Sequence, residues 1–216
     1  MSNLVPDRPK IYYITPVDNL KSIANDKHLL SDRIIRARGD EVREIGMRHI
    51  KDRRLKVNRL RTCTELFVGD CVPFYFCPRS VMLFIIHKSN LQELTYSGGE
   101  KNIVHLEFDL HSVIEWAEAA EKHWEFTNFN AGSSYYEGYN NIDDLNKLNW
   151  RVILSNNWQG EKEAKQSEFL IESKCPFSLV ERIGVIDSNI KTKVEEILGD
   201  THNNPNVIIE PQWYYT

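Results

Sequence analysis

The spacing of hydrophobic and polar residues predicts a chain that alternates between short strands and helices. Runs rich in aromatic and β-branched residues are typical of strands, and they occur at 11–15, 103–108, 124–130, 169–171 and 183–186. Apolar residues at helical spacing predict helices over 20–26, 112–123, 142–148 and 190–198. This order indicates an α+β fold with a mostly antiparallel sheet flanked by helices.

The densest apolar stretch covers residues 68–87, where we expect two strands or one strand bent at Pro78. Proline is poorly tolerated in a central strand, which places the bend there. Arg79 follows this proline, and a charge between two apolar strands needs solvent, a partner or a ligand. Tyr75 and Met82 could offer a flat surface for a nicotinamide ring or a nucleobase.

A polar run at 155–167 has nothing to bury, and it is long for a simple connection in a compact domain. Loops of this kind are usually functional or disordered. The run ends at Glu168, which the apolar residues 169–171 follow at once. A carboxylate at the joint between a loop and a strand is held rigidly, so Glu168 is the first candidate for a catalytic group.

Length and composition fit a globular protein. The chain has 216 residues, of which 41% are hydrophobic and 27% charged, and no repeat or linker divides it. We therefore expect a single domain over 1–216. No apolar run could span a bilayer and no signal peptide is visible, which predicts a cytoplasmic protein without a membrane partner. The four cysteines form no CxxC pair, so we expect reduced thiols and no metal site.

Charge is divided unevenly along the chain. Residues 1–80 hold 16 Lys/Arg against 10 Asp/Glu, whereas the remainder holds 11 against 21. Within 33–61 there are 11 basic and 4 acidic residues, so this segment could attract a polyanion or form a solvated helix face. Arginine can bind a pyrophosphate through paired hydrogen bonds, but Arg53 and Arg54 are adjacent and cannot both face one site from a helix. At most one of them is expected to bind a ligand.

The predicted strand 11–15 ends at Pro16, and Asp18 or Asn19 can cap the helix that follows. A strand that turns into a helix N-terminus is a reasonable place to bind a carboxamide or a phosphate. An ordinary strand-to-helix connection has the same pattern, so this feature alone decides nothing.

Three segments together resemble the DarT family, bacterial toxins that ADP-ribosylate single-stranded DNA. Residues 12–20 read Y-Y-I-T-P-V-D-N-L, where the family has Y-H-I-T-H-x-D-N-L. Residues 72–83 read V-P-F-Y-F-C-P-R-S-V-M-L, a near match to V-P-F-Y-F-x-P-R-S-P-M-L. Residues 165–170 read K-Q-S-E-F-L, like the family's K-Q-A-E-F-L with its catalytic glutamate. Residues 50–54 look like the segment that carries the family's catalytic arginine.

The resemblance implies an ADP-ribosyltransferase-like fold with a central, mostly antiparallel split sheet. It implies an NAD-dependent toxin that transfers ADP-ribose to a base of single-stranded DNA and releases nicotinamide. The expected partner is a DarG-like macrodomain antitoxin, and no metal is involved. The implied catalytic residues are Glu168 and Arg54. The implied NAD contacts are Tyr13, Ile14, Thr15, Asn19 and Tyr75, and the implied DNA contacts are Arg79, Met82, Trp158 and Lys162.

Several positions depart from the family pattern. Two histidines of the opening segment are replaced by Tyr13 and Pro16, and a third expected histidine corresponds to Asn130. Thymine and guanine both remain possible targets, and the missing histidines make a non-thymine base more plausible than usual. An NAD glycohydrolase, a protein ADP-ribosyltransferase and a non-enzymatic nucleic-acid-binding domain are the alternative functions.

Overall fold

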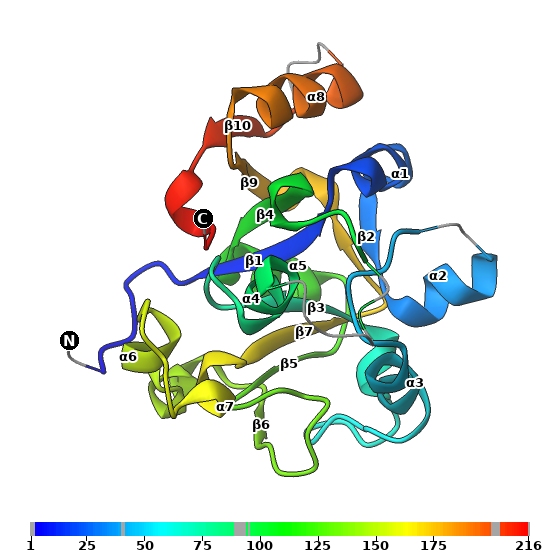
Figure 1. The fold of residues 1–216 in the computed structure, drawn as a ribbon. Helices are drawn as coiled ribbons and strands as arrows, with labels where there is room; N and C mark the ends of the chain where they lie inside the picture. The colour runs from blue at the N-terminus through cyan, green and yellow to red at the C-terminus, as the bar shows by residue number, and fades with distance from the viewer. Residues whose placement is uncertain (1–2, 40–41, 89–93, 95, 200–203, 216) are drawn as a thin grey trace.

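An eight-stranded sheet forms the centre of the molecule (Figure 1). We describe residues 3–39, 42–88, 94, 96–199 and 204–215 of a computed structural model. The strand order is β10-β9-β4-β1-β3-β7-β5-β6, and a small second sheet pairs β2 with β8. The strands are β1 Lys10–Pro16, β2 His28–Leu30, β3 Cys71–Tyr75, β4 Ile103–Asp109, β5 Trp124–Thr127, β6 Gly138–Tyr139, β7 Glu168–Glu172, β8 Lys174–Pro176, β9 Val180–Val185 and β10 Asn206–Ile209.

All neighbouring strands of the large sheet run antiparallel except β9 and β10, which are parallel. The helices are α1 Leu20–Asp26, α2 Asp32–Arg38, α3 Arg48–Lys56, α4 Val81–Lys88, α5 Leu110–Ala119, α6 Trp150–Ile153, α7 Lys162–Lys165 and α8 Ser188–Leu198. Short 3₁₀ turns cover Val17–Asn19, Val68–Asp70, Glu100–Asn102, Ile142–Lys147, Phe177–Leu179 and Pro211–Trp213. The predicted α+β class, with helices around a mostly antiparallel sheet, is confirmed.

The hydrophobic core lies on both faces of the sheet because successive strand residues point to opposite sides. On one face, the Phe74 ring contacts Phe108 edge-on at 5.1 Å between centroids and lies 6.1 Å from Phe169. These rings come from three strands, so they fix the sheet from its middle. The opposite face carries a separate cluster that includes Tyr12 and Ile14 together with residues of α4.

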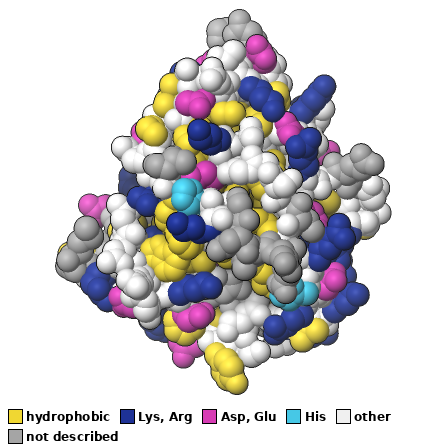
Figure 2. Space-filling view, in the orientation of Figure 1, with side chains coloured by type: hydrophobic (Ala, Val, Ile, Leu, Met, Phe, Trp, Pro, Cys, Tyr) yellow, Lys and Arg dark blue, Asp and Glu magenta, His cyan; other side chains and the backbone are white. Residues whose placement is uncertain are grey.

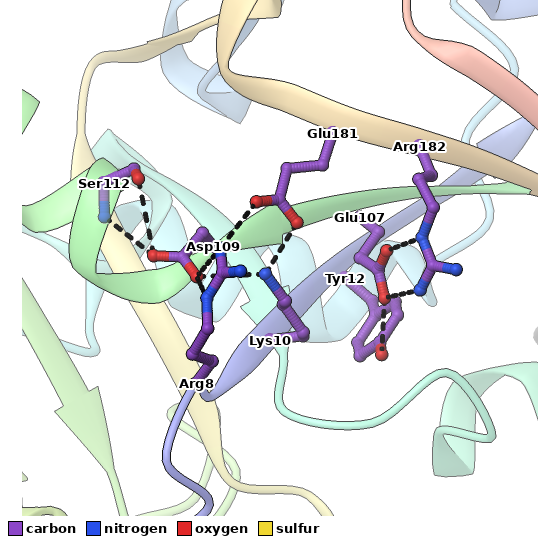
Figure 3. A network of polar contacts seen from close by, with 8 residues as sticks. All are labelled: Arg8, Lys10, Tyr12, Glu107, Asp109, Ser112, Glu181 and Arg182. Atoms are coloured by element: carbon purple, nitrogen blue, oxygen red, sulfur yellow. Dashed lines mark hydrogen bonds and ion pairs between the residues drawn. The ribbon is translucent and has the colours of Figure 1, made fainter.

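A network of charges ties β1, β4 and β9 together on that opposite face (Figure 3). Glu107 is buried and accepts hydrogen bonds from Arg182 through both of its oxygens, while the Tyr12 hydroxyl donates to Oε1 at 3.1 Å. At the end of β4, Asp109 caps α5 by accepting from the Ser112 N–H at 3.1 Å. These contacts align three neighbouring strands.

Several predicted elements are wrong or shifted. Residues 81–87 form the helix α4 instead of a strand, because Ser80 caps a new helix directly after the loop at Pro78 and Arg79. The predicted helix over 142–148 is a 3₁₀ turn, and the helix expected at 112–123 runs from Leu110 to Ala119. Within the described residues, no helix is long and apolar enough to cross a membrane. The single domain over 1–216 stays a prediction.

Candidate active site

Glu168 is the first residue of β7, and its side chain is only 1% exposed. Its backbone N–H donates to the Thr127 hydroxyl of the neighbouring strand β5 at 3.1 Å. On the other side, the register of β3 and β7 places Tyr75 directly opposite Glu168. The backbone that carries this carboxylate is therefore fixed by the strands on both sides, β3 and β5.

Arg54, in the last turn of α3, pairs with this carboxylate through two hydrogen bonds. Its Nη1 donates to Glu168 Oε1 at 3.1 Å, and its Nη2 donates to Oε2 at 2.7 Å. The neighbouring Arg53 is exposed, so of the two arginines it is Arg54 that pairs with the carboxylate. Burial alone would lower the pKa of Arg54, but the adjacent Glu168 carboxylate outweighs it and the pKa lies above its usual value. Arg54 therefore stays charged.

Close packing fixes the helix that carries Arg54. Leu55 is buried against the turn 68–70, and a Cβ atom added to Gly69 would lie 2.6 Å from Leu55 Cδ2. Only glycine allows this approach. The Arg33 side chain also donates to the Leu55 carbonyl oxygen at 2.9 Å. These contacts hold α3 at the distance that lets Arg54 reach Glu168.

Asn19 does not cap α1 with its side chain, contrary to one of the two expected caps. Instead its amide exchanges two hydrogen bonds with the backbone of Arg43, both at 3.0 Å, and also donates to the Thr15 hydroxyl at 3.0 Å. Thr15 and Asn19 line a small cavity of about 30 Å³ together with Tyr13 and His28. Three of the predicted NAD contacts therefore meet around one cavity.

The predicted DNA contacts are brought together only in part. Arg79 and Trp158 line one open hollow beside Phe84 and Tyr215. The partly buried Met82 packs instead into the cluster of Tyr12 and Leu83. Lys162 is exposed at the start of α7 and does not line that hollow.

The polar run 155–167 was wrongly expected to bury nothing. Lys165 is 2% exposed, and its Nζ donates to the carbonyl oxygens of Ile153 at 2.5 Å and Ser155 at 2.9 Å. A buried ammonium needs such acceptors. Lys165 thus joins the loop after α6 to the segment just before Glu168. Its place in the segment K-Q-S-E-F-L, which resembles the family's K-Q-A-E-F-L, was the sequence signal for Lys165.

The model of the family described as "ssDNA thymidine ADP-ribosyltransferase, DarT" matches residues 12–215. The chain belongs to the DarT family. Its predicted class, a DNA ADP-ribosyltransferase, is confirmed by this membership. The family description names thymidine, whereas Tyr13, Pro16 and Asn130 pointed away from that base. In this structure Asn130 Oδ1 accepts from the Gly132 N–H at 2.7 Å.

Similar proteins align with nearly the whole chain. A "DNA ADP-ribosyl transferase" of Thermus aquaticus is 35% identical over 208 residues, which is 95% of this chain and 88% of that protein. The structure of Thermus sp. 2.9 DarT with ADP-ribosylated ssDNA is 30% identical, with a TM-score of 0.87 and 100% coverage of both chains. The same DarT with NAD+ is 27% identical, with a TM-score of 0.76 over 98% of this chain and all of that one.

No group of three or more His, Cys, Asp or Glu side chains is placed to hold a metal ion in the described part of the chain. The DarT site described above consists of one carboxylate, one guanidinium and the ring of Tyr75. Such a set can bind and polarise a ribose and an anionic diphosphate, and it can accept a proton.

Proposed function

We propose that the protein transfers ADP-ribose from NAD to the thymidine base of single-stranded DNA and releases nicotinamide. The observation that carries this proposal is the buried, two-point pairing of Arg54 with Glu168 at the start of β7, in a chain of the DarT family. The matching structures of Thermus sp. 2.9 DarT, with NAD+ and with ADP-ribosylated ssDNA, support the same two substrates.

The reaction breaks one carbon–nitrogen bond and makes another. The bond between the ribose carbon and the nicotinamide ring nitrogen breaks, and nicotinamide leaves as a neutral molecule with the bonding electron pair. Positive charge develops on the ribose carbon, as in glycoside hydrolysis, and the Glu168 carboxylate stabilises it. A base nitrogen then attacks that carbon. In thymidine this is N3, since N1 already carries the deoxyribose, and Glu168 takes its proton.

Arg54 serves this chemistry by holding the carboxylate in one orientation. Two parallel hydrogen bonds fix both oxygens of Glu168, so little movement is needed as charge develops. We place the nicotinamide end of NAD beside Tyr75 and the backbone of Tyr13 and Ile14. Asn19 holds the chain at Arg43 through two hydrogen bonds and donates a third to the Thr15 hydroxyl, which orders the segment that follows β1.

A single strand is the energetically favoured substrate, because in a duplex the acceptor nitrogen is engaged in base pairing and unpairing costs free energy. We propose that Arg79 and Trp158 contact nucleotides beside the reactive base. Met82 would contact them through its exposed part, and Lys162 would bind a phosphate from the exposed start of α7.

We further propose that the protein acts in the cytoplasm as the toxin of a toxin–antitoxin pair. Its partner would be a DarG-like macrodomain that removes ADP-ribose from DNA. Modified oligonucleotide is the test substrate: a macrodomain encoded beside the toxin should restore its original mass. No loss of ADP-ribose after incubation would contradict this assignment.

The target base can be tested with four single-stranded oligonucleotides that differ only at one central position, which is T, G, A or C. Each is incubated with isotope-labelled NAD, and incorporated label is measured. We expect label in the T oligonucleotide alone, and at least tenfold less when the complementary strand is annealed. Equal label in the G oligonucleotide would refute the thymidine assignment, and absence of label from all four would refute transfer to DNA.

A further inference from the structure

Lys165 carries a buried ammonium that pairs with no carboxylate among the described residues. The residue is 2% exposed, and its Nζ donates to the carbonyl oxygens of Ile153 at 2.5 Å and Ser155 at 2.9 Å. Removing an ammonium from water costs free energy even when its hydrogen bonds are satisfied. An apolar side chain of similar length avoids that cost, so filling the space does not by itself account for a lysine here. What the ammonium adds is a set of directed hydrogen bonds.

The thiol of Cys77 is a third group beside this ammonium. Burial raises the pKa of Cys77, while the charge of Lys165 and a hydrogen bond from its ammonium lower it in part, so the pKa stays above its ordinary value. The protonated thiol donates to the Arg79 carbonyl oxygen, with 3.7 Å between Sγ and O. An ammonium has three N–H donors. Lys165 therefore has one acceptor for each donor, namely two main-chain oxygens and one sulfur.

These acceptors belong to two segments that contact DNA in the proposed reaction. One acceptor opens the loop 155–161, which carries Trp158. Another begins the segment 77–79, which carries Arg79. Lys165 itself ends α7, shortly before the strand β7, and α7 lies beside α6 (Figure 1). One buried side chain thus ties both proposed DNA contacts to the strand that carries the catalytic carboxylate.

Other contacts of the loop 155–161 are exposed or only partly buried. At its far end Glu161 pairs with Arg151 at 2.6 Å, and both side chains are more than a third exposed. Exposed ion pairs of this kind contribute little to stability. In between, the partly buried Trp158 meets the partly buried Phe84 edge-on, with 5.3 Å between ring centroids. The hydrogen bonds to the buried ammonium therefore hold the start of the loop from inside the protein.

We propose that Lys165 is a positioning residue that directs the reacting ribose carbon to the DNA base and away from water. It does so by holding the loop 155–161 and the segment 77–79 at fixed distances from Glu168. This inference rests on the proposed function, since it concerns the acceptor of that reaction. When the two segments shift, NAD still binds and its bond to nicotinamide still breaks. A water oxygen then bonds to the ribose carbon in place of the base nitrogen, Glu168 takes the water proton, and free ADP-ribose leaves.

Lys165→Met tests this proposal, because methionine keeps an unbranched side chain of similar length but has no N–H donor. The variant and the wild type are incubated with NAD and a single-stranded thymidine oligonucleotide. ADP-ribosylated DNA and free ADP-ribose are counted in the same reaction. The ratio of DNA product to free ADP-ribose should fall about tenfold and the KM for the oligonucleotide should rise about tenfold, because the acceptor is misplaced. The KM for NAD should stay within about twofold of the wild type.

A lysine that only stabilises the fold gives a different result. Its loss would lower both products together, in proportion to the folded fraction that a thermal melt measures, and would leave their ratio and both KM values unchanged. That result would overturn the proposal. If Lys165→Met does not fold, Cys77→Ala removes the sulfur acceptor alone, and Cys77→Ser keeps a smaller acceptor. The ratio should fall about two- to tenfold in Cys77→Ala and less in Cys77→Ser, and an unchanged ratio in Cys77→Ala would then overturn the proposal.

The loss of one positive charge needs a control of its own. Figure 2 shows Lys and Arg side chains spread over one face of the molecule, and the loss of any of them can weaken binding to DNA. Lys191→Met removes one positive charge from α8, where the partly exposed Lys191 pairs with Glu195 at 3.7 Å. It should keep the product ratio and the KM for the oligonucleotide within about twofold of the wild type. A change as large as that in Lys165→Met would assign the effect to net charge and overturn the proposal.

Amide hydrogen exchange, measured without NAD or DNA, separates this inference from the function on which it rests. Loss of the ammonium should speed exchange both at 153–158 and at 76–80. Faster exchange in both segments, with no transfer to DNA by the wild type, would refute the proposed function and support the anchoring role of Lys165. Transfer by the wild type together with an unchanged product ratio in Lys165→Met would refute this inference alone.

Discussion

Among the described residues, two buried glutamates each pair with an arginine through both carboxylate oxygens, but the two pairs have different roles. Glu168 and Glu107 are each 1% exposed. Glu168 pairs with Arg54, which is 12% exposed, whereas Glu107 pairs with Arg182, which is 42% exposed. Both pairs join a buried carboxylate to a guanidinium through two hydrogen bonds. Their surroundings must therefore account for the difference in role.

Position along the strand separates the two pairs. Glu107 lies inside β4 and also accepts from the Tyr12 hydroxyl, so it joins three adjacent strands in a closed network (Figure 3). Glu168 begins its strand directly after a loop, and its oxygens accept only from Arg54 among the contacts described here. A saturated carboxylate in mid-strand stabilises a sheet. A carboxylate at a strand's start, with acceptor capacity left, can meet a substrate.

The largest effect is expected from Glu168→Gln. The amide keeps the shape of the side chain but cannot stabilise the ribose cation or take a proton, so the rate of ADP-ribose transfer should fall about 10³-fold. Label transfer to a thymidine oligonucleotide measures it, with folding checked by circular dichroism.

Two matched controls accompany this variant. Glu107→Gln makes the same change in the network of Tyr12 and Arg182, and Glu172→Gln makes it at the other end of β7. Both should keep transfer within about twofold of the wild type at a temperature where they are folded. An equal loss of transfer in Glu107→Gln would break the distinction between the two pairs.

Arg54→Lys is expected to have the next largest effect. Lysine keeps the charge but cannot hold both oxygens of Glu168 at once, so transfer should fall about 10- to 100-fold. Arg182→Lys is the matched control in the network and should leave transfer unchanged. Wild-type activity in Arg54→Lys would show that two-point positioning is not needed.

The network region should also show a pH response of its own. His105 is fully buried on β4, and burial lowers its pKa to about 4, so the folded protein keeps it neutral. In the unfolded chain, the imidazole of His105 binds a proton when the pH falls below its ordinary pKa of about 6.5. Stability is therefore full above pH 6.5 and is lost as the pH falls towards 4. The free energy of unfolding should drop by about 2 kcal/mol between pH 7.5 and 5 from this group.

Urea unfolding at the two pH values measures that drop, and His105→Gln supplies the comparison. The variant should be less stable at pH 7.5 but should depend less on pH. The same slope in both proteins would remove His105 as its cause.

The smallest effect is expected from Tyr12→Phe. It removes the hydroxyl that donates to Glu107 and should lower the free energy of unfolding by about 1 kcal/mol without changing transfer. Urea unfolding and label transfer together check this. A fall in transfer without a fall in stability would mean that the network reaches the active site.

Much of the fold could be predicted from local patterns. The helix at Leu20–Asp26 and the strands around Tyr13 and Phe169 follow from periodicity and residue type. The pairing of Arg54 with Glu168 across the chain required a family resemblance, because spacing along a sequence says nothing of contacts between distant segments.

Other features were out of reach for physical reasons. The helix α4 is short and apolar on most of its faces. The periodicity of its residues therefore does not distinguish a buried helix from a strand. Asn19 was assigned to a cap because its acceptor suits a helix N-terminus, but the backbone of Arg43 competes for the same amide. Burial of Lys165 depends on two carbonyl groups that only the folded chain brings together.

The central claim, that Glu168 directs ADP-ribose onto DNA, is tested most directly by counting both products of one reaction. Nicotinamide and ADP-ribosylated thymidine are quantified by mass spectrometry after incubation with NAD and single-stranded DNA. We predict equal amounts of the two with the wild type and neither above background with Glu168→Gln. Nicotinamide release without modified thymidine would contradict the claim and identify an NAD glycohydrolase instead.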